Sequence, residues 1–211
     1  MLMKQAAVKR DPDASRKNIL NAATAEFAAH GFDGARIDAI VRRANVSKNL
    51  AYHYFGGKED LFLLVMERMY ERMRAHHADL QIKGLLPIDG MSQLIRHTFV
   101  HFLEHPEVIS LLNSENLHKA AHIKGSEEIR GLYAELTENM TDILARGERA
   151  GVFRKNVDPI DLYISISALG YFYLSNQHTL GTIFETDLMS SDRIRGREEH
   201  ITEMVLAYLR P

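Results

Sequence analysis

Apolar residues recur along most of this chain at the three- and four-residue spacing that keeps side chains on one face of an α-helix. The clearest case is the stretch 126–150, where the residues at nearly ideal intervals are Ile129, Leu132, Tyr133, Leu136, Met140, Ile143 and Leu144. No segment rich in valine and threonine alternates as a strand does, and the five prolines fall where helices would begin or end. The pattern predicts an all-α fold of about nine helices.

The first helix is expected to run from Asp13 to His30. Gly31 follows directly, and glycine is the residue that most easily adopts the left-handed conformation that ends many helices. Phe32 would then fold back onto Phe27, the apolar contact that accompanies such an ending. This stretch therefore predicts a helix with a defined stop.

Two short helices are predicted next, at about 36–44 and 47–54. Asn45 and Val46 form the turn between them, and Ser47 is a natural N-cap for the second one. A pair of glycines at 56 and 57 then breaks the chain. Residues 1–60 are thus expected to form a three-helix head.

Residues 61–211 are expected to form a larger helical body. A long helix should run from Lys58 to a point before Gly84, and a polar loop is expected at about 181–192. The other predicted helices lie at about 88–104, after Pro106, at 126–150 with Gly151 as its stop, from the Asp158-Pro159 pair onward, and around Ile201–Leu209.

The two short helices and their turn have the form of a helix-turn-helix, with the first helix as support. On the second short helix, Leu50, Ala51 and Phe55 can face a small core. The side chains left to project outward are Lys48, Asn49, Tyr52 and His53, with Arg36, Arg42 and Lys58 beside them. Such side chains can reach base edges and phosphates when the helix lies in a major groove, which predicts binding of double-stranded DNA.

The stretch 16–62, RKNILNAATAEFAAHGFDGARIDAIVRRANVSKNLAYHYFGGKEDLF, resembles the DNA-binding region of the tetracycline-repressor (TetR) family. The IL-x-AA helix, the GF turn, VSK, Y-x-YF and KE-x-L occur in order and at the family's spacing. The resemblance implies DNA contacts by residues of the second short helix and a phosphate contact by a lysine that follows it. The contacts implied by the resemblance fall on Lys48, Asn49, Leu50, Tyr52, His53, Tyr54 and Lys58. Arg36 and Ser47, which flank this helix and its predecessor, complete the set of expected DNA-binding residues.

The chain departs from the family pattern at four positions. Ala35 and Arg36 stand where many members have threonines that open the second helix, so the hydroxyl cap is missing and Arg36 becomes a candidate phosphate ligand. Asn45 and Asn49 stand where glycines are frequent. These departures affect individual contacts rather than the motif.

The resemblance implies that the body holds a small-molecule effector and that the protein is a repressor released from its operator when the effector binds. The alternative is a DNA-bound regulator without a small-molecule effector, which responds to a protein partner or a metal. Candidate pocket residues are polar or aromatic side chains on otherwise apolar helices: His97, His101, Asn113, Asn116, Tyr133, Tyr171 and Asn176. Each of them can equally well make structural hydrogen bonds in the core.

A single head reads few base pairs, so a homodimer on a pseudo-palindromic operator is expected. The segment 158–176 is apolar on nearly all sides, and Ser167 and Gly170 would let a partner helix approach closely. The residues predicted for the dimer interface are Tyr163, Ser167, Gly170, Tyr171, Leu174, Met204 and Tyr208. The alternative is a central helix buried within one protomer.

Charge and composition indicate which part of the chain can bind a polyanion and exclude several kinds of site. The net charge of −2 divides into +3 over residues 1–60 and −5 over residues 61–211, as suits polyanion binding by the head alone. The absence of cysteine excludes disulfides, thiol nucleophiles and thiolate metal sites. No apolar run reaches the length of a membrane span, and the N-terminus lacks the apolar core of a signal peptide, so a cytoplasmic protein without membrane contact is expected.

Neither an enzyme nor a cofactor is expected, because GxSxG, Gly-rich phosphate loops and Walker patterns are missing. Two histidine series have helical spacing, at 97, 101 and 105 and at 118 and 122, which would place rings on one face as a divalent metal requires. No HExxH pattern accompanies them. Solvent-facing or core histidines are therefore the preferred interpretation, and no metal site is predicted.

Overall fold

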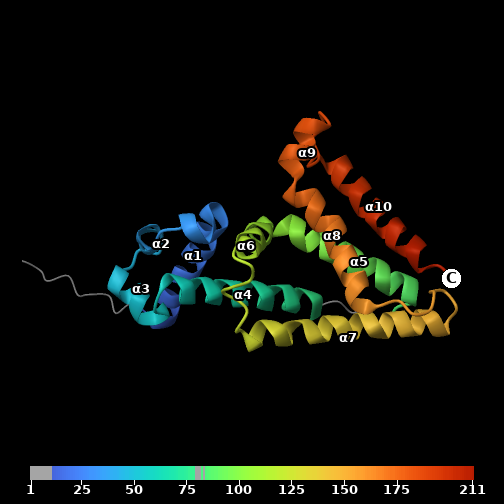
Figure 1. The fold of residues 1–211 in the computed structure, drawn as a ribbon, viewed down its shortest axis with the longest axis horizontal. Helices are drawn as coiled ribbons and strands as arrows, with labels where there is room; N and C mark the ends of the chain where they lie inside the picture. Colours follow the sequence, from blue (N-terminus) through green and yellow to red (C-terminus); the bar gives the residue numbers. More distant parts are fainter. Residues whose placement is uncertain (1–10, 79–81, 83) are drawn as a thin grey trace, which may run out of the picture. The chain divides into compact units, whose positions relative to one another are not determined.

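The computed structural model describes residues 11–78, 82 and 84–211, apart from the side chains of residues 76–78 and 132–136. Every regular element in this part of the chain is a helix, so the all-α prediction is confirmed (Figure 1). The helices are α1 (Pro12–Gly34), α2 (Ile37–Arg43), α3 (Lys48–Phe55), α4 (Lys58–Ala78), α5 (Pro87–Glu104), α6 (Pro106–Leu117), α7 (Glu127–Arg149), α8 (Pro159–Ser175), α9 (Gln177–Ile183) and α10 (Ser191–Leu209).

Side-chain caps fix two of the predicted helix starts. The Ser47 hydroxyl oxygen accepts a hydrogen bond from the Leu50 N–H at 3.3 Å and so begins α3. The Asp158 carboxylate accepts from the N–H groups of Ile160 and Asp161, at 2.7 and 3.0 Å, and so begins α8. Both caps satisfy N–H groups that have no partner within the helix, and both predictions are confirmed.

Gly31 interrupts α1 as predicted, with φ at +66°. Three more residues follow as a short turn before α1 ends at Gly34. The Phe32 ring stacks on Phe27, with the ring centroids 6.3 Å apart. Because a side chain would strain this backbone conformation, Gly31 sets the direction in which the chain leaves the supporting helix.

The chain between α8 and α10 differs from the prediction. The polar loop was expected from about 181, whereas α8 ends at Ser175 and a separate seven-residue helix, α9, follows it. Asn176 separates the two helices, and its side-chain amide donates to the Phe172 carbonyl at 2.9 Å. Gly181 lies within α9, and a single glycine in a helix lowers stability without forbidding the helix.

The described chain divides into two compact units. The head unit comprises the chain up to Met66 together with 111–124, and the body unit comprises 67–110 and 125–211. The sequence had placed the boundary at 60 and had assigned 111–124 to the body. Two helices, α4 and α6, each begin in one unit and end in the other.

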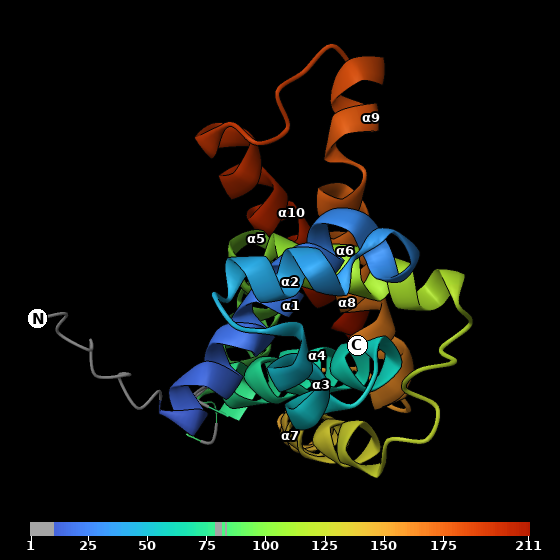
Figure 2. The same ribbon diagram turned by 90° about the vertical axis from the view of Figure 1, so that its left-hand side faces the viewer.

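The head unit is built around a small apolar core beneath α2 and α3, which lie in front in Figure 2. Ile19 and Phe27 of α1, Ile40 of α2 and Phe62 of α4 are fully buried. The Phe27 and Phe62 rings meet edge to face, with centroids 4.9 Å apart. This core holds α2 and α3 on a fixed support.

The body unit is organised around α5, which packs against α7, α8 and α10. Gly170 of α8 faces this helix: a Cβ atom there would lie only 3.3 Å from a ring carbon of Phe99. Leu174, one turn later, is also buried. The sequence had expected the missing side chain to admit a helix of a partner subunit. That expectation is corrected, because the close approach is to α5 of the same chain.

No described helix combines the length and the apolar run that crossing a lipid bilayer requires.

Candidate functional site

The recognition helix, α3, is amphipathic in the structure. Ala51 and Phe55 are buried against the head core, and the Arg16 guanidinium lies 5.7 Å from the centre of the Phe55 ring. Leu50 and Tyr54 are half-buried at the edges of the helix. The inner face is therefore committed to packing, as the sequence predicted for Leu50, Ala51 and Phe55.

The opposite face of α3 carries four exposed polar or aromatic side chains. Tyr52 is 45% exposed, and Lys48, Asn49 and His53 are also exposed. Tyrosine with nearly half its surface in solvent is unusual for a structural residue, and all four side chains can donate or accept hydrogen bonds. Their outward orientation is confirmed, whereas their contact with DNA stays a prediction.

Lys48 has a partner that the sequence reasoning missed. Its ammonium nitrogen lies 2.8 Å from a carboxylate oxygen of Asp38 on α2. The hydrogen bond between them, followed by their charge interaction, raises the pKa of Lys48 and lowers that of Asp38. The two residues are ten positions apart on different helices, so no helical spacing pointed to the pair.

Arg36 is the N-cap residue of α2 and has no side-chain cap, as its replacement of threonine implied. Its backbone N–H instead donates to a carboxylate oxygen of Glu26 at 3.3 Å. Glu26 is buried in α1, and its other oxygen lies 3.9 Å from His30 Nε2. The Arg36 side chain is exposed and so stays available to a phosphate.

Lys58 opens α4 and is half-buried. Its ammonium group donates to the Asp33 carbonyl at 3.2 Å and lies 4.9 Å from the centre of the Phe32 ring. In this position, it ties the start of α4 to the end of α1. A phosphate contact by Lys58 stays a prediction, and it would require the ammonium group to share or leave these contacts.

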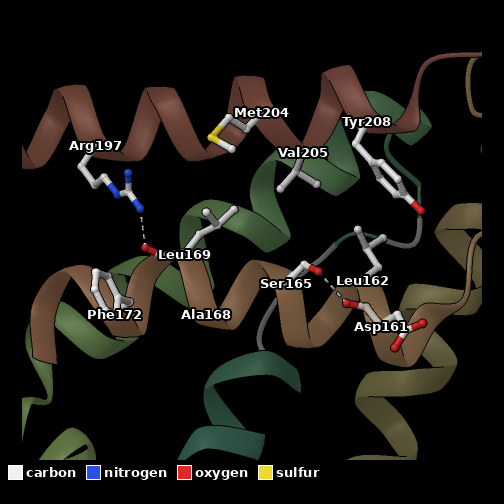
Figure 3. A pocket seen from close by; sticks show the side chains of 10 residues that line it. All are labelled: Asp161, Leu162, Ser165, Ala168, Leu169, Phe172, Arg197, Met204, Val205 and Tyr208. Atoms are coloured by element: carbon white, nitrogen blue, oxygen red, sulfur yellow. Dashed lines mark hydrogen bonds between the residues drawn. The ribbon is translucent and has the colours of Figure 1, made fainter.

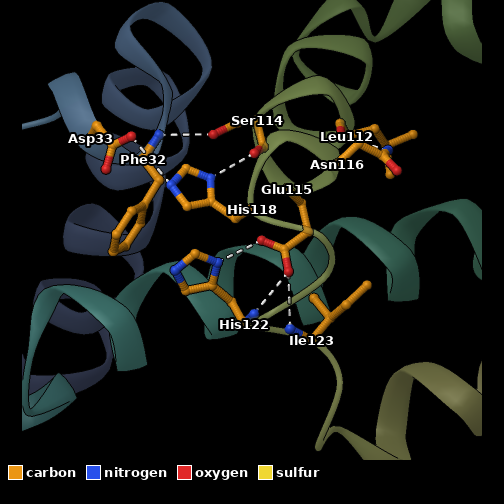
Figure 4. A network of polar contacts seen from close by, with 9 residues as sticks. All are labelled: Phe32, Asp33, Leu112, Ser114, Glu115, Asn116, His118, His122 and Ile123. Atoms are coloured by element: carbon orange, nitrogen blue, oxygen red, sulfur yellow. Dashed lines mark hydrogen bonds and ion pairs between the residues drawn. The ribbon is translucent and has the colours of Figure 1, made fainter.

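A second polar site within the head unit surrounds Glu115, close to the end of α6 (Figure 4). Glu115 is only 2% exposed. One carboxylate oxygen accepts from the N–H groups of His122 and Ile123, at 2.9 and 3.1 Å, and the other lies 2.6 Å from His122 Nδ1. These donors satisfy the hydrogen-bonding capacity of the buried carboxylate and anchor the turn that follows α6.

The same turn is joined to the end of α1. The Ser114 hydroxyl accepts from the Phe32 N–H at 2.8 Å, and the His118 ring lies between the Ser114 carbonyl and the Asp33 carboxylate. The His122 ring lies over Phe32, with centroids 4.2 Å apart. These contacts explain why residues 111–124 belong to the head unit.

The helical spacing inferred for His118 and His122 is wrong, because α6 ends at Leu117. Lys119 and Ala120 have positive φ values, 57° and 59°, so the chain turns rather than continuing as a helix. The two imidazole rings nevertheless lie close, with centroids 5.2 Å apart. Their partners are carboxylates and a carbonyl within the head unit.

The other histidine series lies at the end of α5. The rings of His101 and His105 are 4.9 Å apart, His101 is buried, and His105 Nδ1 lies 3.3 Å from a carboxylate oxygen of Glu107. Among the residues whose side chains the structure describes, no three His, Cys, Asp or Glu side chains are grouped as metal ligands.

Two of the pocket candidates in the body unit lie beside the same aromatic ring. His101 and Tyr171 both lie edge-on to Phe102, with ring centroids 6.3 and 5.7 Å away. Burial raises the pKa of the Tyr171 hydroxyl. His97, one turn before His101, is half-buried. These side chains supply polar groups among apolar neighbours, as a small-molecule site requires.

The remaining pocket candidates lie elsewhere. Asn113 and Asn116 are exposed and belong to the head unit, and the Asn116 amide donates to the Leu112 carbonyl of its own helix. Asn176 ends α8. The Tyr133 side chain lies outside the described residues.

An apolar groove runs between α8 and α10 on the outer side of the body unit (Figure 3). Figure 3 shows α10 above and α8 below, with Phe172, Met204 and Tyr208 among the side chains that line it. Phe172 is 58% exposed and Tyr208 53%. Ile164, on the same outer side of α8, is 57% exposed. Exposed apolar residues gathered in this way mark a surface that a partner covers.

The structure separates the residues predicted for the dimer interface. Met204 and Tyr208 line the groove, whereas Tyr163, Ser167 and Tyr171 are half-buried and are not among its lining residues. Gly170 and Leu174, as described above, belong to the protomer's own core. The sequence pattern alone missed Ile164 and Phe172, because α8 is apolar on all sides and periodicity could not say which side α5 covers.

Two family profiles match this chain. The profile described as "Bacterial regulatory proteins, tetR family" matches residues 19–65 and covers α2, α3 and most of α1. The profile described as "Tetracyclin repressor-like, C-terminal domain" matches residues 87–205, which is more than half of the chain.

Individual proteins agree with the profiles. The HTH-type transcriptional repressor NicS of Pseudomonas putida is 33% identical over 198 residues, which cover 94% of this chain and 93% of NicS. The crystal structure of the regulator SCO4942 from Streptomyces coelicolor has a TM-score of 0.70 and 26% identity, over 93% of this chain and 99% of that one. FadR from Bacillus subtilis, solved with stearoyl-CoA, shares the fold, with a TM-score of 0.64 and 14% identity over 92% of this chain and all of FadR. Both the helix-turn-helix and the C-terminal helices thus have counterparts in one group of proteins, and the chain belongs to the TetR family of bacterial transcriptional regulators.

Proposed function

We propose that this regulator is a repressor that binds a pseudo-palindromic operator as a homodimer and leaves it when a small molecule binds in the body unit. TetR-family regulators bind operator DNA as homodimers and respond to small-molecule effectors. The relative NicS is named a repressor. We further propose that the chain acts by binding alone, without catalysis, and in the cytoplasm, where bacterial operator DNA lies.

The observation that carries the proposal is the outward face of α3. Lys48, Asn49, Tyr52 and His53 project from a helix whose other face is fixed to the head core. A major groove admits one helix, and these side chains have the reach and the hydrogen-bonding groups to contact base edges and phosphates. Arg36 and Arg42, also exposed, extend the same basic surface on α2 and beside it.

The groove between α8 and α10 supports a second part of the proposal, in which it forms the dimer interface. Two recognition helices must stand about 34–36 Å apart to enter successive major grooves. A partner that covers Ile164, Phe172 and Tyr208 would bury the largest exposed apolar side chains of the two helices. For the effector, we propose a site in the body unit that includes His101 and Tyr171.

The operator-binding proposal is tested with a duplex that the wild-type protein selects from random sequences. We expect Tyr52→Ala to lower affinity for this duplex by about tenfold, because one good base contact contributes that much discrimination. Lys48→Ala should weaken operator and random duplexes alike, as loss of a phosphate contact does. Fluorescence anisotropy at fixed salt measures both, and size-exclusion chromatography checks that each variant keeps its oligomeric state. Failure of the wild type to select any duplex refutes the proposal.

Asp38→Asn is expected to strengthen binding to random duplex DNA. The substitution removes a carboxylate 2.8 Å from the Lys48 ammonium group, so Lys48 no longer divides its charge between Asp38 and the DNA phosphate that it contacts. The slope of log affinity against log salt concentration should steepen by up to about 0.9, which is the contribution of one fully neutralised phosphate. Asp192→Asn is the matched control, because it releases Arg195 from an ion pair on α10 of the body unit. An unchanged slope for Asp38→Asn would show that Asp38 does not compete with a phosphate for Lys48.

A further inference from the structure

The His118 ring has a hydrogen-bond acceptor at each of its nitrogens (Figure 4). Nδ1 lies 2.8 Å from the Ser114 carbonyl oxygen, and Nε2 lies 3.2 Å from a carboxylate oxygen of Asp33. A neutral imidazole carries one N–H and one lone pair, so it can satisfy only one of these two acceptors. Both are satisfied only when the ring is protonated, and the geometry is therefore that of an imidazolium bridge.

The charged groups around the ring agree with this assignment. Asp33 faces it from the end of α1, Glu115 from α6, His122 from the turn after α6, and Lys58 from α4 through its bond to the Asp33 carbonyl. The pKa of His118 is raised, chiefly by the hydrogen bond to the Ser114 carbonyl; burial opposes this effect, and Asp33 and Glu115 add to it. Glu115 is itself bonded to His122, so Asp33 is the carboxylate that contacts the His118 ring directly.

The bridge joins α6 to the chain that leads into the helix-turn-helix. Asp33 lies three residues before Arg36, the N-cap of α2, and Phe32 is held to Ser114 by its own N–H. Phe32 and Asp33, in the chain that leads into α2, are thus held to α6 and the turn after it, and of these two contacts only the one made by His118 depends on a proton. Loss of that proton leaves the bonds of the Phe32 N–H and the Asp33 carbonyl in place and removes the charged contact of the Asp33 side chain.

We propose that His118 is a proton-dependent positioning residue, which in its charged form holds the α1–α2 junction in the geometry that binds operator DNA. The proposal rests on the function proposed above. The folded protein binds the proton more tightly than an unfolded chain does, so the bridge is fully present below about pH 6.5 and is lost as the pH rises through the higher pKa of the folded state. Operator affinity should therefore fall as the pH rises through that range.

The test compares the wild type with His118→Gln, which keeps one donor but carries no charge at any pH. Operator affinity is measured between about pH 6 and about pH 8.5. The wild type should lose about threefold more affinity over this range than the variant, the size expected for a bridge to an exposed carboxylate. Other histidines of the head unit are common to both proteins, so the comparison between the two proteins, rather than either profile alone, reports the bridge. His200→Gln, at an exposed position of α10, should keep the wild-type profile.

Two results would overturn the inference: identical pH profiles for the wild type and His118→Gln, or a steeper profile for the variant. An NMR titration of the His118 ring supplies an independent measurement, because Asp33→Asn should lower its pKa even where DNA is absent. If the wild type binds no operator at any pH, the proposed function fails; if it binds but the two profiles coincide, only the role of His118 fails. The two failures are therefore distinguishable.

Discussion

Replacing Ile164 by glutamate is expected to convert the dimer into monomers and to lower operator affinity by about 100-fold or more. Ile164 is 57% exposed on the outer side of α8, beside the groove that Met204 and Tyr208 line. A carboxylate forced into an apolar interface is an uncompensated buried charge, which costs several kcal/mol. Operator affinity falls when dimerisation is lost, because the second head then binds its half-site without the advantage of being joined to the first.

Sedimentation velocity measures the oligomeric state, and anisotropy measures the operator affinity of the same samples. Ala145→Glu is the matched control, since it places the same charge at an exposed position of α7. The control should remain dimeric and bind as the wild type does. A dimeric Ile164→Glu protein with normal affinity would remove the α8–α10 groove as the interface.

Removing the Glu115 carboxylate, as in Glu115→Ala, should destabilise the protein by about 3 kcal/mol, because buried donors that lose their acceptor each cost about 1–3 kcal/mol. The substitution leaves three buried donors without their acceptor: two backbone N–H groups and His122 Nδ1. For a chain of this length, the melting temperature should fall by about 6–12 °C. Thermal unfolding followed by circular dichroism measures the change.

Two further variants separate the reasons for this loss. Glu115→Gln keeps one carbonyl acceptor and should recover about half of the stability, since a neutral acceptor bonds less strongly than a charged one. Glu127→Ala removes a glutamate whose side chain is almost fully exposed in the first turn of α7, and it should change stability by less than about 0.5 kcal/mol. Equal melting temperatures for Glu115→Ala and Glu127→Ala would contradict the role assigned to the buried carboxylate.

Local sequence patterns were enough to predict where several helices begin and which side chains of the recognition helix, α3, face outward. Ser47 and Asp158 begin helices because a serine or aspartate oxygen satisfies N–H groups within the next three residues. Gly31 interrupts α1 because glycine takes a positive φ without strain. The inward and outward faces of α3 followed from helical periodicity. All of these features depend on residues a few positions apart, which is the distance over which a sequence pattern is informative.

The contacts that individual residues make became known only from the folded structure. Gly170 faces α5 rather than a partner subunit, Lys48 pairs with Asp38, and His118 bridges Ser114 and Asp33 instead of forming a helical ladder with His122. In each case, the deciding neighbour lies on another helix or beyond a turn. A uniformly apolar helix such as α8 has no preferred side until α5 covers one, and an ionisable group has no defined charge state until its partners are in place.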